Sequence, residues 1–266
     1  MNTTSPVIAA ADRIEQAAAT GEPCAPVRDL LGSEDLAAAY AVQQVFVERR
    51  LAAGAVIVGR KIGLTSPAVQ QQLGVHQPDF GVLFDDMDLS AAADRVPIDR
   101  LLQPKIEAEI AFILAEDLTH ELTPDHVRAA VAYAAPAFEI VDSHIANWDI
   151  SITDTIADNA SSGLFVLGET RLGLDHFEPV AATMQLHADG KLVSEGTGAA
   201  CLGDPLNALL WLARTAHEFG EPLRAGQIIL SGALGPMVAV TPGASLSAEI
   251  SGLGTVRATF TEKAAA

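Results

Sequence analysis

Three glutamates on two apolar, β-prone stretches of this 266-residue sequence have the spacing of a metal site. Glu107 and Glu109 lie two residues apart in QPKIEAEIAFIL, so a strand directs both carboxylates to one face. Two charges about 6 to 7 Å apart repel each other by about 2 to 3 kcal/mol, which a cation would relieve. The pair alone is more typical of solvated glutamates on an edge strand. Glu139, in AAPAFEIVDSHI, again sits on an apolar face, and three carboxylates favour Mg²⁺ or Mn²⁺ over Zn²⁺.

A lysine between two glycines is the second candidate. In VIVGRKIGLTS, Lys61 shares a strand face with Gly59 and Gly63, which leave room for another molecule to approach the backbone. From this stretch alone, a surface lysine on an edge strand is an equally good interpretation. Arg60 faces the other way and is interpreted as structural.

Two polar segments complete the set of candidates. GVHQPDFGVLFDDM places His76 and Asp79 in a loop punctuated by Pro and Gly, where functional side chains are often carried. Turn formation is the competing interpretation of Asp79. ADNASSGLFVLG places Ser161 ahead of a strand, where it caps a turn or donates a hydrogen bond to an anion. Taken alone, this segment favours the turn.

The elements that must position these residues are helices followed by a β-rich part. We predict helices over residues 7–19 and 33–53, the second capped by Ser33, and two later helices that begin after Thr123 and Asp204. Strands are predicted in the β-prone stretches AVIVGRKIG, KIEAEIAFIL, PAFEIVDS, GLFVLG, VAATMQLHADGKLVSEG, GQIILSG and GTVRATF. The fifth stretch contains a hairpin turn at Asp189-Gly190. Because strands and helices do not alternate strictly, a Rossmann or TIM fold is disfavoured. We therefore expect an α+β chain with a helical segment over residues 1–54 and a mixed-β catalytic domain over residues 55–266.

Composition limits the classes of partner. The chain has 16 basic and 34 acidic residues, a formal charge of −18 and no basic cluster, so a nucleic-acid partner is not expected. A protein this acidic needs a local cation to hold a small anion. Every apolar run is too short to span a bilayer, and the N-terminus lacks the features of a leader, so we expect no membrane partner and a cytoplasmic location. Cys24 and Cys201 have no metal or redox spacing.

Five stretches, in this order, resemble the 2-keto-4-pentenoate hydratases of aromatic meta-cleavage pathways, within the fumarylacetoacetate hydrolase superfamily. They are GRKIGLTSPAVQQQLGVHQPDFGVLFDDM, LLQPKIEAEIAFIL, PAFEIVDSHI, ADNASSGLFVLG and IILSGAL. The likeness covers roughly residues 33–262. It implies a mixed β-sheet roll with an N-terminal helical segment, a Mg²⁺ or Mn²⁺ ion and a 2-hydroxydienoate or 2-oxo acid substrate.

The resemblance also assigns roles to single residues. The three metal ligands match Glu107, Glu109 and Glu139. Lys61, with a pKa lowered by burial, would pair with the substrate carboxylate or C2 oxygen and shuttle a proton. Asp79 would be the general acid or base, and Ser161 would hold the substrate carboxylate by a hydrogen bond.

The reaction implied is hydration of 2-hydroxypenta-2,4-dienoate, through 2-oxopent-3-enoate, to 4-hydroxy-2-oxopentanoate or a homologue. One alternative is a metal-dependent 4-oxalocrotonate (2-oxo-3-hexenedioate) decarboxylase, with Arg60 or Lys105 holding the second carboxylate. The retained HQPDFG segment favours the hydratase. An alternative of another class is a non-catalytic partner subunit that binds small 2-oxo acids. Family likeness further implies a homo-oligomer, associated with a pathway decarboxylase or aldolase.

Overall fold

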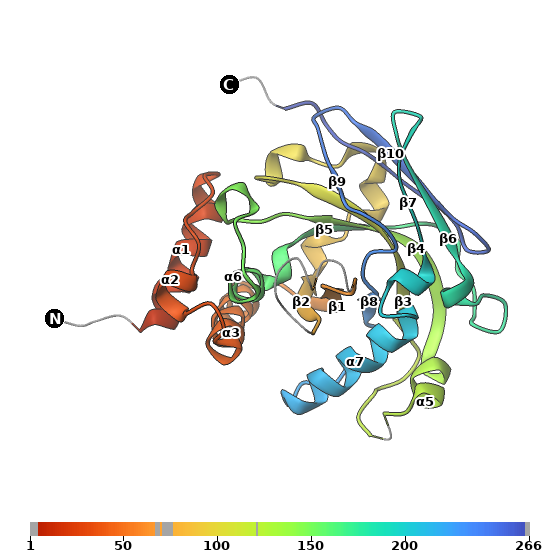
Figure 1. Cartoon of the computed structure of the whole chain (residues 1–266), viewed down its shortest axis with the longest axis horizontal. Helices are drawn as coiled ribbons and strands as arrows, with labels where there is room; N and C mark the ends of the chain where they lie inside the picture. The colour runs from red at the N-terminus through yellow and green to blue at the C-terminus, as the bar shows by residue number, and fades with distance from the viewer. Residues whose placement is uncertain (1–4, 67–69, 71–76, 121, 264–266) are drawn as a thin grey trace.

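The computed structural model describes residues 5–66, 70, 77–120 and 122–263. These residues form two β-sheets, with α1 and α3 on one side of the molecule and the smaller sheet on the other (Figure 1). The larger sheet has the order β2-β1-β8-β3-β4-β5, and β9 pairs with β3. The β1–β8 pair is parallel and the other pairs are antiparallel, so the sheet is mixed. Its strands are β1 (Ile57–Gly63), β2 (Asp79–Phe84), β3 (Lys105–Leu114), β4 (Val131–Val141), β5 (Ser162–Leu167), β8 (Ile228–Leu230) and β9 (Val238–Ala239).

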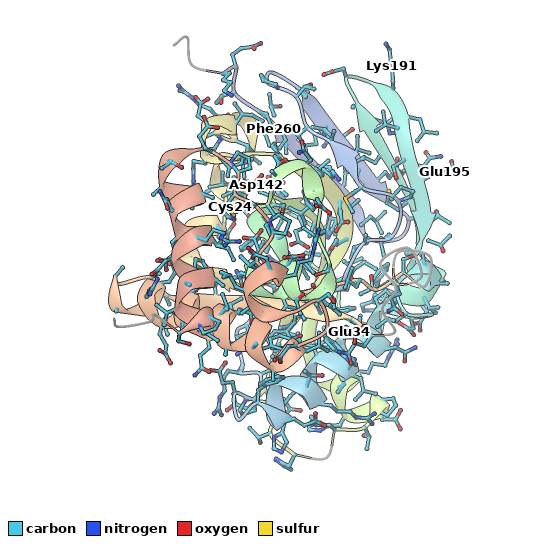
Figure 2. All side chains as sticks on the ribbon, turned by 60° about the vertical axis from the view of Figure 1, so that its left-hand side comes forward. Cys24, Glu34, Asp142, Lys191, Glu195 and Phe260 are labelled. Atoms are coloured by element: carbon cyan, nitrogen blue, oxygen red, sulfur yellow. The ribbon has the colours of Figure 1, made fainter. Side chains whose placement is uncertain are left out.

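The smaller sheet has the order β11-β10-β6-β7 and is antiparallel throughout. Its strands are β6 (Thr183–Ala188), β7 (Lys191–Thr197), β10 (Ser245–Ile250) and β11 (Gly254–Thr259). The predicted hairpin turn is confirmed, because Asp189 and Gly190 join β6 to β7 with φ values of 50° and 77°. Figure 2 shows Lys191 and Glu195 on β7, at the outer edge of the molecule.

The helices are α1 (Pro6–Thr20), α2 (Arg28–Leu31), α3 (Leu36–Ala52), α5 (Pro124–Ala129), α6 (Ile152–Ala157) and α7 (Pro205–Glu218). Four of the described helices were predicted, whereas the short helices α2 and α6 were not. Thr123 and Asp204 are N-caps as predicted, but α3 is capped by Asp35, whose carboxylate accepts the Ala38 N–H at 3.0 Å, and not by Ser33. Among the described residues, no helix combines the length and the apolar character needed to cross a membrane.

The alternation of β3 separates the core from the site. Ile106, Ile110 and Phe112 point into the main apolar core, which also contains residues of β4, β10, β11 and α7. The odd-numbered residues Glu107 and Glu109 therefore lie on the opposite face. Because the two faces of β3 differ in this way, a strand in the middle of the sheet can carry two carboxylates that point away from the main apolar core.

One predicted loop is a strand. Asp79 was expected in a Pro- and Gly-punctuated loop, but it begins β2, whose residues 79–84 are all buried and pair with β1. Helix α3 lies against this strand, and the Gln43 amide donates to the Phe80 carbonyl at 2.8 Å. Pro78 and Gly81 concealed the strand, because both residues usually interrupt one.

Asp154 fastens the N-terminal helical segment to α6. This fully buried carboxylate accepts the backbone N–H groups of Val27 and Arg28 at 2.8 and 2.9 Å, and it pairs with the Arg28 guanidinium at 2.7 Å. The same guanidinium also pairs with the exposed Asp149 at 2.8 Å. The division of the chain at residues 54 and 55 falls between α3 and β1 and stays a prediction.

We predict that Asp154→Ala destabilises the protein by about 3 kcal/mol, because it leaves buried N–H groups and a guanidinium without their acceptor. For a chain of this size the loss lowers Tm by roughly 6 to 12 °C, measured by calorimetry. Asp149→Ala is the matched control, since it removes the exposed partner of the same arginine and should lower Tm by less than about 3 °C. Equal effects of the two variants would contradict this account.

Candidate metal centre and active site

The sheet register brings the three predicted glutamates together. Glu107 on β3 lies directly opposite Glu139 on β4, and Glu109 follows two residues along β3. One carboxylate oxygen from each of the three lies within 4.8 Å of the others. Glu109 and Glu139 are buried, and Glu107 is partly buried. The cluster thus combines a cross-strand pair with an i, i+2 pair on one face.

The oxygen atoms of this cluster suit a divalent cation. Glu109 Oε2 accepts the Gly232 N–H at 2.8 Å, but Glu109 Oε1 and Glu139 Oε2 are buried without a hydrogen-bond partner among the described residues. Burial and the neighbouring Glu139 charge raise the pKa of Glu107 to about 7 and that of Glu109 well above its ordinary value. Unpaired buried carboxylate oxygens are the ligands that Mg²⁺ and Mn²⁺ prefer. The residues present therefore fit a hard divalent ion.

Lys61 lies inside the sheet, so the alternative of a surface lysine on an edge strand is wrong. Strand β1 is flanked by β2 and β8, and Lys61 Nζ lies 3.0 Å from Glu139 Oε1 and donates to the Ala160 carbonyl at 2.8 Å. Burial lowers the pKa of Lys61, but the charges of Glu139 and Asp79 outweigh it and hold the pKa above its ordinary value. Without a metal ion the neighbouring carboxylates thus favour the charged form of Lys61, and the lowered pKa expected for a lysine beside a bound metal stays a prediction.

The glycines beside Lys61 make room for other parts of this chain, and Gly63 also lines the cavity described below. A Cβ on Gly59 would lie 1.9 Å from the Ile228 carbonyl oxygen of β8. A Cβ on Gly63 would lie 2.2 Å from Asp79 Oδ1. Gly59 thus permits the parallel pairing with β8, and Gly63 leaves the space that the Asp79 carboxylate occupies.

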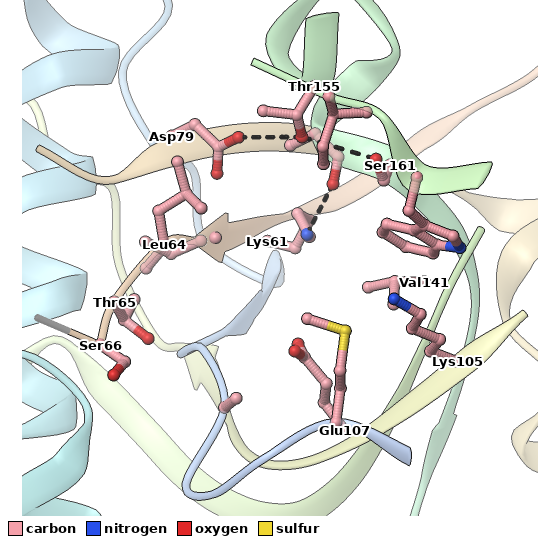
Figure 3. Close-up of a pocket in the computed structure, with 17 residues that line it drawn as sticks. Lys61, Leu64, Thr65, Ser66, Asp79, Lys105, Glu107, Val141, Thr155 and Ser161 are labelled. Atoms are coloured by element: carbon pink, nitrogen blue, oxygen red, sulfur yellow. Dashed lines mark hydrogen bonds between the residues drawn. The ribbon is translucent and has the colours of Figure 1, made fainter. Parts of the chain in front are cut away.

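The Asp79 carboxyl group is connected to two hydroxyl groups, those of Thr155 and Ser161, by a short chain of hydrogen bonds (Figure 3). Its Oδ2 accepts from Thr155 Oγ1 at 3.3 Å, and Thr155 Oγ1 lies 3.5 Å from Ser161 Oγ. Asp79 Oδ1 is buried with no hydrogen-bond partner among the described residues, and burial raises the pKa of this carboxyl group. A buried carboxyl group with a raised pKa and an unpaired oxygen has the properties that general acid–base chemistry requires.

Sequence reasoning missed Thr155. It is buried on the six-residue helix α6, and its position six residues before Ser161 is the one signal in the sequence that could have drawn attention to it. A threonine hydroxyl carries one proton, so donation to Asp79 leaves Ser161 as the donor toward Thr155. Thr155 therefore connects the predicted acid–base residue to the predicted substrate-binding residue.

A left-handed turn presents Ser161 and the Ala160 carbonyl. Asn159, Ala160 and Ser161 have φ values of 51°, 53° and 53°, which are uncommon for residues other than glycine. The Asn159 side chain holds the turn against β2 by accepting from Val82 N at 2.8 Å and donating to Val82 O at 2.9 Å. A Cβ on Gly81 would lie 2.3 Å from the Asn159 carbonyl oxygen, so this contact requires glycine. Backbone strain of this kind often occurs at functional sites.

A cavity of about 210 Å³ is lined by Lys61, Asp79, Glu107, Thr155 and Ser161. Figure 3 shows Asp79, Thr155 and Ser161 on one side of it, Glu107 on the opposite side and Lys105 beside Val141. Further apolar side chains that line the cavity are Trp148, Ile150 and Met237.

The two candidates for a second cation differ in their position. Lys105 lines the cavity, but Arg60 does not, because it is turned toward Glu221, with an ion pair of 2.7 Å. Arg60 is thus structural, as expected. His76 lies outside the described residues.

Comparison with known proteins places this geometry in a family. The family model described as fumarylacetoacetate (FAA) hydrolase C-terminal matches residues 57–261. The chain belongs to the fumarylacetoacetate hydrolase family. This membership and the α+β fold with a mixed sheet confirm the prediction from the sequence.

Two relatives within this family are named as hydratases. A "TodF product hydratase" of Pseudomonas putida is 55% identical over 97% of this chain and 96% of its own length. A 2-keto-4-pentenoate hydratase of Paraburkholderia xenovorans is 52% identical over 94% of this chain and 93% of its own. The likeness to the 2-keto-4-pentenoate hydratases is thereby confirmed. Among solved structures, a 4-oxalocrotonate decarboxylase from Pseudomonas putida G7, complexed with magnesium and adipate, has a TM-score of 0.92 and 34% identity, covering 98% of this chain and 99% of its own.

We predict that divalent-metal affinity falls as the pH is lowered through the raised carboxyl pKa values, about 7 for Glu107. Because protons compete with the ion, the Kd for Mn²⁺ measured by calorimetry should rise between pH 8 and pH 6, by about tenfold per pH unit for each displaced proton.

The stability of the metal-free protein should also depend on pH through the raised pKa values of these carboxyl groups. An acid whose pKa is raised in the folded state stabilises the fold when protonated, so this stability is lost as the pH rises through about 7. We therefore expect Tm without metal to fall between pH 6 and pH 8, and saturating Mn²⁺ to reverse the trend. A pH-independent Kd would show that these carboxylates are not the ligands.

Proposed function

We propose that this protein is a hydratase that adds water to 2-hydroxypenta-2,4-dienoate, or a homologue, in the catabolism of aromatic compounds. The observation that carries the proposal is the three-glutamate cluster, whose Glu107 lines one cavity together with Lys61, Asp79 and Ser161. Relatives of 51% to 55% identity over most of the chain, named as hydratases, support it.

We assign Glu107, Glu109 and Glu139 as the residues that hold Mg²⁺ or Mn²⁺. A divalent ion there would supply a Lewis acid and a template for the oxygen atoms of a 2-oxo acid. The unpaired buried oxygens of Glu109 and Glu139 support this assignment, as does the 34% identical decarboxylase, whose structure is complexed with magnesium.

The reaction needs two proton relocations and one addition. The dienol loses its hydroxyl proton and gains one at C5, which gives 2-oxopent-3-enoate. Water then adds at C4, its oxygen bonding to carbon, while a proton reaches C3. We assign these proton transfers to Asp79, whose raised pKa suits a group that both accepts and donates.

Lys61 and Ser161 have binding roles in this mechanism. Lys61 is held by the Ala160 carbonyl and Glu139, and its ammonium group would stabilise the negative charge that develops on the substrate oxygen. The Ser161 hydroxyl lines the cavity, and when Asp79 is protonated and donates to Thr155, the Ser161 proton is released from Thr155 and can be donated to the substrate carboxylate. Val141, Ile150 and Met237 provide an apolar surface for the hydrocarbon part of the substrate.

The alternatives are less well supported. The structurally similar decarboxylase is 34% identical, whereas the relatives named as hydratases reach 55%. Arg60 does not line the cavity, which leaves Lys105 as the candidate for a second carboxylate. A non-catalytic binding subunit would not need the chain from Asp79 through Thr155 to Ser161. The homo-oligomer, the association with a pathway enzyme and the cytoplasmic location stay predictions.

The direct test is the activity of purified protein with Mg²⁺ or Mn²⁺ and 2-hydroxypenta-2,4-dienoate. We expect loss of dienol absorbance and formation of 4-hydroxy-2-oxopentanoate. Glu107→Gln and Glu109→Gln should each lower kcat/KM by about 100-fold or more, because each removes a charged metal ligand. Glu195→Gln, on the outer strand β7, is the control. Full activity of both ligand variants with EDTA present would refute the metal mechanism, and release of CO₂ from 4-oxalocrotonate without hydration would identify a decarboxylase.

We also predict that Thr155 sets the proton affinity of Asp79. Thr155→Val keeps the shape but removes the hydrogen bond that lowers the pKa of Asp79, so this pKa should rise. The limb of the kcat profile that reports Asp79 should move to higher pH, and kcat should fall about 10- to 100-fold with little change in KM. Thr155→Ser should restore the wild-type profile. An unchanged profile for Thr155→Val would show that the hydroxyl chain has no part in proton transfer.

A further inference from the structure

Lys105 is a cation at the cavity for which the mechanism above has no use. It lies on the same face of β3 as Glu107 and lines the cavity with it. Its Nζ lies 4.0 Å from the centroid of the Trp148 ring, a cation–π contact. Among the described residues, no carboxylate lies within ion-pair distance of this ammonium group, so its N–H donors are available to an anion.

Trp148 is held beneath Lys105 by a strained turn. Asn147 and Trp148 have φ values of 61° and 55°, and this left-handed conformation is unfavourable for a bulky residue. Gln103 stabilises the turn, because its side-chain carbonyl accepts the Asn147 N–H at 2.8 Å and its backbone carbonyl accepts from Trp148 Nε1 at 3.0 Å. The Gln103 amide in turn donates to the Ser143 and Ile145 carbonyls, both at 2.8 Å.

The charge of the site creates the need for such a cation. Three ionised glutamates around a divalent ion would leave one net negative charge, and in the state in which Asp79 is ionised its charge would cancel that of Lys61. A 2-oxo acid is itself an anion, so it would be attracted weakly to this centre and would approach a chain of formal charge −18. Lys105, two residues from Glu107 on the same strand face, supplies the missing positive charge beside the metal ligands.

We propose that Lys105, fixed on the Trp148 ring, binds the 1-carboxylate of the 2-oxo acid substrate. The inference rests on the proposed function, because it takes a 2-oxo acid as the ligand. The 1-carboxylate is the charged group of such a 2-oxo acid, and Lys105 lies two residues from Glu107 on the same face of β3. Ser161, which lines the same cavity, contributes a second hydrogen bond to this carboxylate. Val141, Ile150 and Met237, which also line the cavity, are apolar and carry no charge that could bind the carboxylate.

The test measures binding and not turnover. 2-Oxopentanoate lacks the double bond that is hydrated, so its Kd can be measured by calorimetry with the Mn²⁺-loaded protein. Lys105→Met should raise this Kd about 10- to 100-fold, because it removes a charged hydrogen bond while keeping the length of the side chain. Lys105→Arg should recover most of the affinity. Lys191→Met, a substitution of an exposed lysine on β7, should leave the Kd unchanged.

A neutral ligand and a dicarboxylate complete the design. 2-Oxopentanamide lacks the charge, so its Kd should be the same for wild type and Lys105→Met. 2-Oxoadipate carries a second carboxylate, and its Kd should rise by the same factor as that of 2-oxopentanoate in Lys105→Met. A loss confined to 2-oxoadipate would assign Lys105 to the distal carboxylate and overturn the proposal, as would an unchanged Kd for 2-oxopentanoate.

Failure of this inference is distinguishable from failure of the proposed function. Wild-type protein that binds 2-oxopentanoate through Lys105 but does not hydrate the dienoate would retain the inference and refute the hydratase. Trp148→Phe gives an independent check, since a smaller ring provides a weaker cation–π platform and should raise the Kd less than Lys105→Met. If Trp148→Phe and Lys105→Met both bound 2-oxopentanoate with the wild-type Kd, neither Trp148 nor Lys105 would take part in substrate binding.

Discussion

The mutual repulsion of three clustered carboxylates, two of them buried and one partly buried, is the constraint on which the rest of this structure depends. Glu107, Glu109 and Glu139 direct oxygen atoms to within 4.8 Å of one another, and burial adds to the cost of ionising them. One ammonium group, that of Lys61, contacts the cluster at Glu139. Ionisation of all three near neutral pH therefore requires a further cation, and a divalent ion satisfies both the charge and the unpaired oxygens.

Each part of the fold near the cluster positions a group relative to these charges. The alternation of β3 separates the glutamates from the core, and the register with β4 places Glu139 opposite Glu107. The strand β1 carries Lys61 to the same place, and glycines at positions 63 and 81 permit the approach of Asp79 and of the left-handed turn before β5. Strain in the backbone is accepted at two turns that border the cavity, one bearing Ser161 and the other bearing Trp148.

Local patterns in the sequence predicted most of the strands and the long helices, because these depend on periodicity and capping. Short motifs singled out the six candidate residues, but their roles came from the resemblance to a known family, since several of these stretches taken alone favoured a turn or a solvated side chain. Features that depend on contacts distant in sequence were not predictable in this way. Asp79 was assigned to a loop because Pro78 and Gly81 mask the strand β2, and the glycines near Lys61 were assigned to a ligand because their neighbours, Ile228 and Asp79, come from other strands. Thr155 has no motif of its own, and its role follows from its distances to Asp79 and Ser161.

The central claim is that the three glutamates hold one divalent ion. It is tested most directly by a crystal structure of the protein soaked with Mn²⁺, with anomalous diffraction measured at the manganese edge. The account predicts one strong anomalous peak, coordinated by carboxylate oxygens of Glu107, Glu109 and Glu139, with the Lys61 ammonium group outside the coordination sphere. An empty cluster at saturating Mn²⁺, or a peak bound elsewhere in the protein, would contradict it.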